Sequence, residues 1–539
     1  MPLIAIMLVL AVYLADDLAA WPFAESPLGT KWRLALSLLA FALVVGIAGL
    51  IITVLSRRLR RKGSVRAAVW ADRLVGWTTW VLAGVHLANI VLLHWVQAVR
   101  DVVGDIVIVD ELLAVLPVLL AFVAIWWLHY PMQRRIREAS MLRRADSGAT
   151  VYPIWTRRQY VLMQARFHFG LILPPVFLIL AWSESVDRLW PWGSERIPAA
   201  DLLGQVLVLL GAIGVFVFAP LLVRHLWDTM PLPPGPLRDG LEAMCRRHGI
   251  RVRAILIWRT WGGMINGAVM GLLGRFRYIL LTDALLDHLQ PVQVQAVMAH
   301  ELGHVRRRHM PWLALSLVAI IGASGSLVTL GAVWAANRLD EARTSATTGS
   351  EMAAGLSAFA TTTPAGTSAL VAPDDQSTSG RSRVETGITE SFAAPPLTPD
   401  GELITPAPVW LEPLIIALTF GTTMFGLGWC SRRFERQADT FAVQHLSGLG
   451  RREGGDRPVT HESVVAMVTA LQLVADLNHI PVRRRSWRHG SIRSRQKYLF
   501  GLVGKPCGRL RIDRMIALIK LSVLVLFIAT LVLQYLLTR

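Results

Sequence analysis

Long apolar runs, separated by short charged loops, restrict the fold of this chain more than any other feature of its sequence. A helix needs about 20 apolar residues to cross a bilayer, because every backbone polar group inside the lipid must be bonded within the segment. The runs lie at 2–16, 34–55, 74–96, 112–130, 168–183, 201–223, 311–336, 409–430 and 515–536, of which the first and fifth are short. Hydrophobic residues make up 53% of the 539 positions and charged residues only 17%. The sequence therefore predicts an all-α multi-spanning membrane protein with about nine transmembrane helices.

The charges in the loops predict which side of the membrane each loop occupies. Segment 56–73 carries seven basic residues and one acid, and segment 131–167 carries eight arginines and two acids. The loops 97–111 and 184–201 are acidic instead, with four acids each against one and two arginines. Because Lys and Arg concentrate in cytoplasmic loops, we expect the two basic segments and the N-terminus inside and the C-terminus outside. The expected location is a bacterial-type plasma membrane.

This count of spans divides the chain into five parts. They are an N-terminal membrane domain of about six helices (1–223), a cytoplasmic part (224–310), a transmembrane hairpin (311–430) with an outer loop (337–408), a second cytoplasmic part (431–514) and a C-terminal helix (515–539). The outer loop is rich in Ser, Thr, Ala, Pro and Gly, so we expect it to be flexible rather than a folded receptor domain. The net charge of +18 is explained by the cytoplasmic loops, which indicates contact with the lipid bilayer and no nucleic-acid partner. The three scattered cysteines indicate neither disulfides nor a thiolate zinc site.

A His-Glu-x-x-His motif lies in the first cytoplasmic part, behind three runs that look like strands. Those runs are 252–258, 266–271 and 277–282. Pro291 suits the first turn of the helix that carries the motif. His300 and His304 are four residues apart, so both rings leave the same face of that helix and can bind one zinc ion. Zinc lowers the pKa of a bound water to about 7, and Glu301 can then act as general base.

A third ligand is needed, because the bare motif also occurs on ordinary surface helices. Segment 431–445, directly after the eighth run, offers Glu435 as that ligand. Asp439 lies one turn further along the same face and is suited to hold a ligating histidine by its far nitrogen. The alternative for 431–445 is an amphipathic helix with solvated charges. Both candidate segments border the hairpin, so the predicted topology brings them out on the same, cytoplasmic side.

The sequence between about 240 and 510 resembles integral-membrane zinc metallopeptidases of the HtpX-like and CAAX prenyl protease type, a gluzincin group. Five segments carry the resemblance in order: NGAVMG, YILLTDALLDHL, AHELGHVRRRH, SRRFERQADTFA and RHGSIRSRQKYL. The resemblance implies a mostly helical zincin-type catalytic domain with a small β-hairpin edge, facing the cytoplasm. It also implies one Zn²⁺ per subunit and hydrolysis of peptide bonds. The six N-terminal spans exceed what bacterial HtpX-like members carry.

The resemblance also implies roles for further residues. His300, His304 and Glu435 would bind zinc, and Glu301 would be the catalytic base. His489 would stabilise the oxyanion, and Arg495 would pair with the Asp439 region. Asn266 and Ala268 would lie on the edge strand that receives the substrate as an added strand. The chain departs from the family where Gly267 separates that pair and where Gly490 replaces a frequent Pro.

We therefore predict a zinc metalloendopeptidase that cleaves membrane or membrane-associated polypeptides, with a role in membrane-protein quality control. The alternatives are a CAAX-type protease, a signalling protease that cuts a regulator, and a membrane scaffold without catalysis. A receptor or transporter built on the first six spans is a further alternative, which polar residues along those spans would favour. Outside the motifs, we expect His309 to face solvent and His445 to be an ordinary surface histidine.

Overall fold

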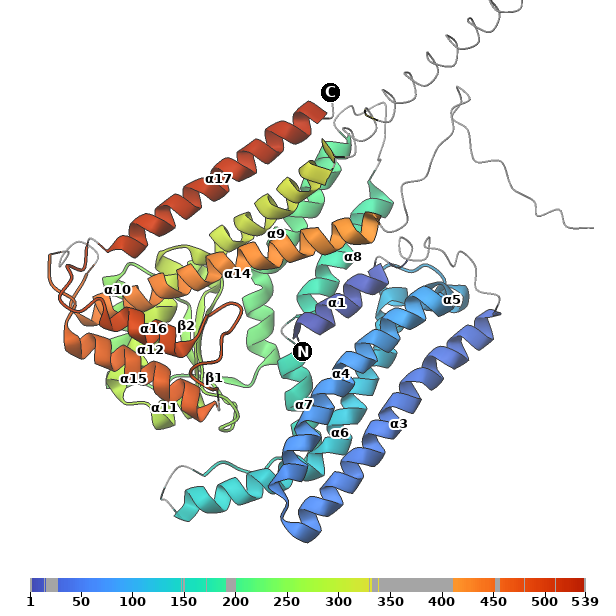
Figure 1. The fold of residues 1–539 in the computed structure, drawn as a ribbon, viewed down its shortest axis with the longest axis horizontal. Coiled ribbons are helices and arrows are strands. Elements are labelled where there is room, and N and C mark those ends of the chain that lie inside the picture. The colour runs from blue at the N-terminus through green and yellow to red at the C-terminus, as the bar shows by residue number, and fades with distance from the viewer. Residues whose placement is uncertain are drawn as a thin grey trace, which may run out of the picture. The chain divides into compact units, whose positions relative to one another are not determined.

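The computed structural model of the chain contains two units (Figure 1). The first holds residues 1–308, 435–486 and 490–510, and the second holds 309–434, 487–489 and 511–539. The structure describes residues 2–13, 28–146, 151–170, 172–190, 200–328, 411–450, 456–478, 480–508 and 510–537, with isolated positions at 15, 148, 330, 331 and 338. The predicted outer loop therefore lies almost wholly outside the described residues.

Three long helices lie side by side at the start of the first unit (Figure 1). They are α3 (Thr30–Lys62), α4 (Val65–Leu93) and α6 (Val109–Asp146), accompanied by the shorter α1 (Pro2–Tyr13) and α5 (Trp95–Val103). A left-handed Gly63 ends α3, and the Ser64 hydroxyl caps α4 by accepting from the backbone of Ala67. Leu50 and Trp80 are exposed on the outside of these helices, as expected for surfaces that face lipid.

Six of the described helices are long and apolar enough to cross a membrane, or seven if the bent pair α7 and α8 forms one span. The six are Thr30–Lys62, Arg66–Leu93, Val109–Leu142, Leu203–Leu226, His309–Val328 and Arg511–Leu536. The prediction of a mostly helical chain with several candidate spans is confirmed, but the predicted count of nine transmembrane helices is not. The first predicted run forms the 12-residue α1, only about 18 Å long and too short for a bilayer. The eighth lies within α14 (Leu411–Leu446), which is not among the six.

The fifth predicted run is interrupted by a bend, and the sixth lies within one helix. A bend of 50° separates α7 (Arg157–His168) from α8 (Leu173–Leu189). Pro174 and Pro175 favour the start of a new helix, α8, at this point, because proline is best tolerated in the first turn of a helix. Helix α9 (Ala200–Leu226) packs alongside α8 and leads into the sheet of the first unit.

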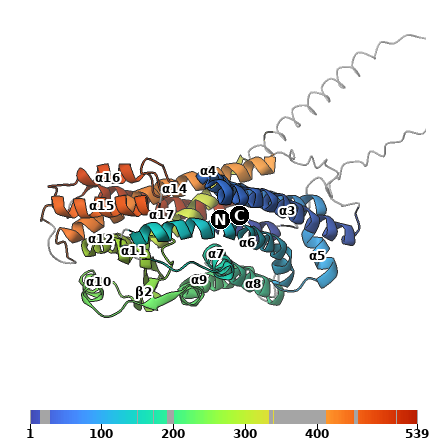
Figure 2. The same ribbon diagram turned by 90° about the horizontal axis from the view of Figure 1, so that it is seen from below.

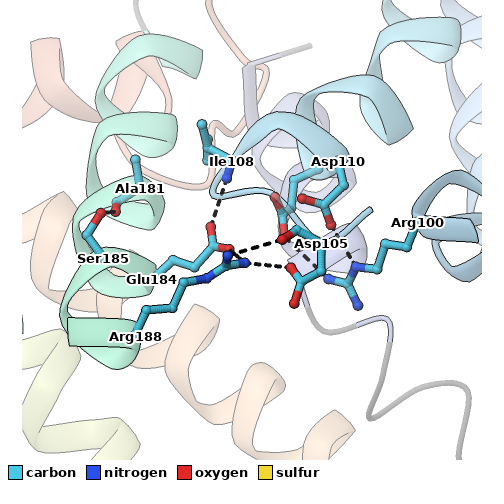
Figure 3. Close-up of polar contacts among 9 residues, drawn as sticks. Arg100, Asp105, Ile108, Asp110, Ala181, Glu184, Ser185 and Arg188 are labelled. Atoms are coloured by element: carbon cyan, nitrogen blue, oxygen red, sulfur yellow. Dashed lines mark hydrogen bonds and ion pairs between the residues drawn. The ribbon is translucent and has the colours of Figure 1, made fainter. Parts of the chain in front are cut away.

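A network of ion pairs ties the loop between α5 and α6 to α8 (Figure 3). Arg100 binds Asp110 at 2.6 Å, and Arg188 binds both Asp105 and Glu184 at 2.6 Å. Glu184 also accepts from the backbone N–H of Ile108, which has a left-handed φ of 62°. This conformation is costly for a β-branched residue, so the network holds the loop in one shape.

The part of the first unit that follows α9 is built on a mixed sheet with strand order β1-β2-β4-β3. The strands are β1 (Thr229–Pro231), β2 (Ala254–Trp258), β3 (Gly267–Met270) and β4 (Tyr278–Thr282), and a 3₁₀ turn, η1 (Gly274–Phe276), precedes β4. β4 pairs in parallel with β2 and antiparallel with β3. The three predicted strands are confirmed, and β3 and β4 form the expected small hairpin at the edge of the sheet. The sequence does not predict β1, because a tripeptide is too short to show an alternating pattern. β1 pairs with β2 and makes the sheet four-stranded.

Alternate residues of the strands face opposite sides of this sheet. Trp258 and Tyr278 pack on one side with Phe167 and Trp227, and the rings of Trp227 and Trp258 stack at 4.0 Å. On the other side, helix α12 (Pro291–Arg306) packs against β3. The sheet thus lies between α12 and the ends of α7 and α9.

The remaining helices of the first unit gather around α12 (Figure 1, Figure 2). They are α10 (Pro236–Arg247), α11 (Asp283–His288), the end of α14, α15 (His461–Leu477) and α16 (Ile492–Phe500). α15 packs on α12, where the Gln293 amide donates to Thr469 at 3.1 Å. α11 begins with Asp283 after the N-cap Thr282, so Asp283 is the first helical residue and not the cap.

The second unit holds the helix His309–Val328, the part of α14 before residue 435, and α17 (Arg511–Leu537). Lys520 of α17 lies over the ring of Trp312 at 5.6 Å. Gly426 of α14 meets Ile320, and Gly322 meets Thr530, so small residues let these helices approach closely.

Candidate metal centre

Helix α12 carries both motif histidines on its buried face. Pro291 is its first residue, as predicted, and Gln290 and Gln293 form a reciprocal capping pair at its start. His300 is 8% exposed, and His304 is half-buried. The centre therefore forms inside the first unit and is not a set of solvated surface histidines.

The side chains of His300, His304 and Glu435 converge on one point. Each offers one atom, and these atoms lie within 4.8 Å of one another. The two Nε2 atoms are 3.3 Å apart, and each lies 3.6 Å from an oxygen of Glu435. Two atoms bound at about 2.0–2.2 Å to one zinc ion with tetrahedral geometry are roughly 3.3–3.6 Å apart. These three side chains therefore fit zinc in donor chemistry and spacing, and three protein ligands leave a fourth position for water.

Asp439 orients the ring of His300. Its Oδ1 lies 2.9 Å from Nδ1 of His300, and Asp439 is fully buried. A carboxylate at this distance favours the tautomer with the proton on Nδ1, which leaves the lone pair of Nε2 directed at the metal position. Burial alone would lower the pKa of His300, but Asp439 and Glu435 outweigh it and raise this pKa.

Arg495 neutralises the buried carboxylates. Its Nε and Nη2 donate to the two oxygens of Asp439 at 2.7 and 2.5 Å, and its Nη1 lies 3.6 Å from Glu435. Burial would raise the pKa of Asp439, but Arg495 and His300 outweigh it and hold this pKa below its usual range. The geometry is the bidentate fork that makes arginine–carboxylate pairs strong, and it keeps Asp439 charged beside His300.

Gly303 of the motif allows α14 to cross α12 closely. A Cβ atom at Gly303 would lie 3.2 Å from the Cα of Ala438 and from the Cβ of Phe441. Ala438 lies between Glu435 and Asp439, so the close crossing brings both carboxylates to the histidines. The end of α14 is almost wholly buried, which contradicts the alternative of an amphipathic helix with solvated charges.

The edge strand β3 lies beside the motif helix α12, and its register follows from its pairing with β4. Thr282 N–H donates to the carbonyl of Asn266 at 3.0 Å, so these two residues form a hydrogen-bonded pair. Such pairs alternate along an antiparallel ladder, so the backbone groups of Ala268 face β4. The backbone groups of Gly267 and Val269 therefore point away from β4. Ala268 lies on β3 and Asn266 directly precedes it, and their role in binding substrate stays a prediction.

Two residues predicted for catalysis have different placements. Glu301 follows His300 on α12, is partly exposed, and interacts electrostatically with Arg495. His489 is exposed and belongs to the second unit, at the tip of a turn closed by the Ser486–Gly490 bridge. Its role as oxyanion donor stays a prediction.

Two histidines expected at the surface are buried. His309 is fully buried in the second unit, where its ring stacks on Phe434 at 4.5 Å. His445, at the end of α14, is 9% exposed and lies 2.7 Å from the Nε2 of His248. Burial and neighbouring positive groups lower the pKa of both His248 and His445 to about 4. Arginines beside His309 favoured solvent exposure of that residue in the sequence. For His445, only the tertiary packing reveals its contact with His248.

Residues 263–370, which include β3, β4 and the His-Glu-x-x-His helix, match the model of Peptidase family M48. The chain is 29% identical over 134 residues to a protein named protease HtpX homolog from Aeropyrum pernix, and 24% identical over 147 residues to another from Syntrophotalea carbinolica. The alignments cover 24% and 27% of this chain and 40% and 51% of those relatives, so the chain spans about half the length of the relatives it matches.

A solved structure, that of S. mikatae Ste24p, aligns with 87% of this chain and 99% of its own, at 13% identity and a TM-score of 0.40. The predicted resemblance is confirmed by the matches in sequence: residues 263–370 match the model of Peptidase family M48, and the chain is similar to two proteins named protease HtpX homolog.

Proposed function

We propose that this protein is a zinc-dependent endopeptidase embedded in a membrane. The observation that carries the proposal is the convergence of His300, His304 and Glu435 to within 4.8 Å, because two imidazoles and a carboxylate are a donor set of catalytic zinc sites. Glu435 lies outside the residues that match the peptidase family, so its place beside the histidines is independent support.

The residues of the centre have complementary tasks in peptide hydrolysis. When bound, zinc polarises the scissile carbonyl and lowers the pKa of water. Glu301 takes the proton from the attacking water and delivers it to the leaving amine. Asp439 keeps the Nδ1 proton of His300 in place, and Arg495 keeps Asp439 ionised. His489 is the proposed donor to the oxyanion.

The substrate is an extended polypeptide that adds to the free edge of β3. Strand addition supplies main-chain hydrogen bonds to any sequence, which suits an endopeptidase. Gly267 and Val269 offer their backbone groups to the added strand, and the exposed side chain of Asn266 lies at its start. Gly267 also lets β3 approach the motif helix, since a Cβ atom there would lie 3.0 Å from Val297.

The metal centre faces the cytoplasm of a bacterial-type plasma membrane in this proposal. The basic segments 56–73 and 131–167 support the orientation, because they flank the candidate spans on one side. Polypeptides of the membrane or its surface are then the accessible substrates, and removal of damaged membrane proteins is the physiological role that we propose.

The proposal is tested by cleavage of an unfolded membrane-protein reporter with detergent-purified, zinc-loaded protein. We expect the wild type to cut the reporter and the Glu301→Gln variant to bind one zinc ion without cutting. Cleavage by the variant at the wild-type rate would exclude Glu301 as the base. A wild type that holds one zinc ion and cuts neither this reporter nor unstructured peptides would favour the catalytically inactive scaffold.

A further inference from the structure

The loop between β2 and β3, residues 259–266, is held in one conformation from both ends. At its start, Asp283 accepts from the backbone N–H of Thr260 at 3.1 Å, from its hydroxyl at 2.7 Å and from the N–H of Trp261 at 2.6 Å. Trp261 has a left-handed φ of 54°, which is unfavourable for a bulky residue unless its surroundings enforce it. This conformation therefore depends on Asp283.

Asn478 holds the other end of this loop. Its Oδ1 accepts from the N–H of Ile265 at 3.0 Å, and its Nδ2 donates to the carbonyl of Ile265 at 2.8 Å. A side-chain amide that binds both backbone groups of one residue mimics a neighbouring strand. Ile265 is buried and directly precedes Asn266 and β3, so Asn478 determines where the edge strand begins.

The same contacts connect the edge strand to the motif helix. Asn478 is the C-cap of α15, and α15 packs on α12 through Gln293 and Thr469. The next residue after Ile265 is fixed by Thr282, whose hydroxyl accepts from the N–H of Asn266 at 3.0 Å. The chain of contacts from α12 through α15 to β3 thus sets the offset between the edge strand and the histidines.

We propose that Asn478 is a positioning residue for substrate: it sets the register in which an added peptide strand meets the metal centre. The inference rests on the proposed function and goes beyond it, since Asn478 lies outside the matched family segment and outside the metal centre. A long peptide that pairs along β3 needs this register, whereas a peptide spanning little more than the cleaved bond does not.

The test uses two quenched fluorescent peptides that share one cleaved bond, one of four residues and one of ten. With the full-length, zinc-loaded Asn478→Ala variant, we expect the KM of the long peptide to rise and its kcat/KM to fall about tenfold, the effect of losing two net hydrogen bonds. The kcat/KM of the short peptide should change less than twofold. Zinc content should stay at the wild-type value.

Two further variants make the result specific. Thr282→Val removes the hydroxyl that binds Asn266 and should give the same dependence on peptide length. If Asn478→Ala does not fold, this variant still tests whether the register of β3 controls cleavage of the long peptide. Gln472→Ala, on the same helix, loses side-chain bonds to Asp476 and Gln496 but none to the loop, so it should behave as wild type.

Binding of the long peptide to proteins that also carry Glu301→Gln, followed by fluorescence anisotropy, gives a readout without cleavage. We expect Asn478→Ala to weaken this binding about tenfold. Equal losses for both peptides, or none, would overturn the positioning role while leaving the protease intact. If the wild type neither binds nor cuts the peptides, the edge strand is not a substrate site, and the inference fails together with the proposed function.

Discussion

A single carboxylate, Asp439, links the three charged parts of the metal centre. It holds His300 through Nδ1, is held by Arg495 through two hydrogen bonds, and lies one helical turn beyond Glu435. A fully buried carboxylate persists only when it is paired and hydrogen-bonded. In the proposed zinc site, this pairing would favour the tautomer of His300 that leaves Nε2 free to bind the metal.

The role of Asp439 predicts the effect of an isosteric change. Asp439→Asn should weaken zinc binding about 10- to 100-fold, because the amide no longer favours the proton on Nδ1 of His300. Competition with a fluorescent zinc chelator measures this change in the purified protein. Asp476→Asn is the matched control, since Asp476 is exposed on α15 and binds only Gln472 among the contacts described. A zinc affinity of Asp439→Asn equal to that of the control would show that His300 needs no such partner.

Among the secondary-structure elements, α14 decides whether the site exists. Its buried end meets α12 at Gly303 and meets α10 through the His445–His248 contact. The site therefore depends on how these helices pack as well as on its ligands. The contact between α14 and the end of α10 is made by two titratable side chains, His445 and His248.

The buried histidine pair predicts acid sensitivity. His248 and His445 have pKa values of about 4 in the folded protein, against about 6.5 in an unfolded chain. Between these values the unfolded state binds more protons, so the stability present above pH 6.5 is lost as the pH falls toward 4. We expect the fall in Tm between pH 7.5 and 5.0, measured on metal-free protein, to be smaller for His445→Gln than for wild type.

The control for this prediction is His461→Gln, because His461 is exposed at the start of α15. It should show the same fall in Tm as wild type. The burial argument is wrong if His445→Gln loses as much stability on acidification as the wild type and this control. Metal-free protein is used so that proton competition for the zinc ligands does not contribute to the difference.

Local sequence patterns predicted the helices and strands whose formation depends on residues close together in the chain. The start of α12 follows from Pro291, and the strands β2, β3 and β4 follow from short apolar runs between turn residues. Apolar composition does not reveal breaks or helix length. It therefore gave a full count to the short α1 and to the α7–α8 pair, which is bent by 50° and adds a span only if the pair crosses as one. The contact of Arg495 with Asp439 was implied by family resemblance alone, because residues so far apart in sequence show no pattern. The Asn478–Ile265 contact gave no signal in sequence.

For the whole molecule, the metal centre constrains the topology. Its ligands come from α12, which precedes the helix His309–Val328 in the sequence, and from α14, which follows it. That helix is long and apolar enough to cross a membrane. If that helix spans, the chain between residues 307 and 434 must cross an even number of times, since the ligands converge on one side. The predicted hairpin at 311–430 satisfies this condition with two crossings.

The central claim is that this hairpin returns Glu435 to the histidines to complete a zinc site. The most direct test is the zinc content of the purified full-length protein, beside Glu435→Ala and the control Glu462→Ala, whose carboxylate is exposed on α15. We predict one zinc ion per chain in the wild type and the control, and loss of this zinc in Glu435→Ala after dialysis against a weak chelator. A Glu435→Ala protein that keeps one tightly bound zinc ion and cleaves as the wild type does would contradict the account.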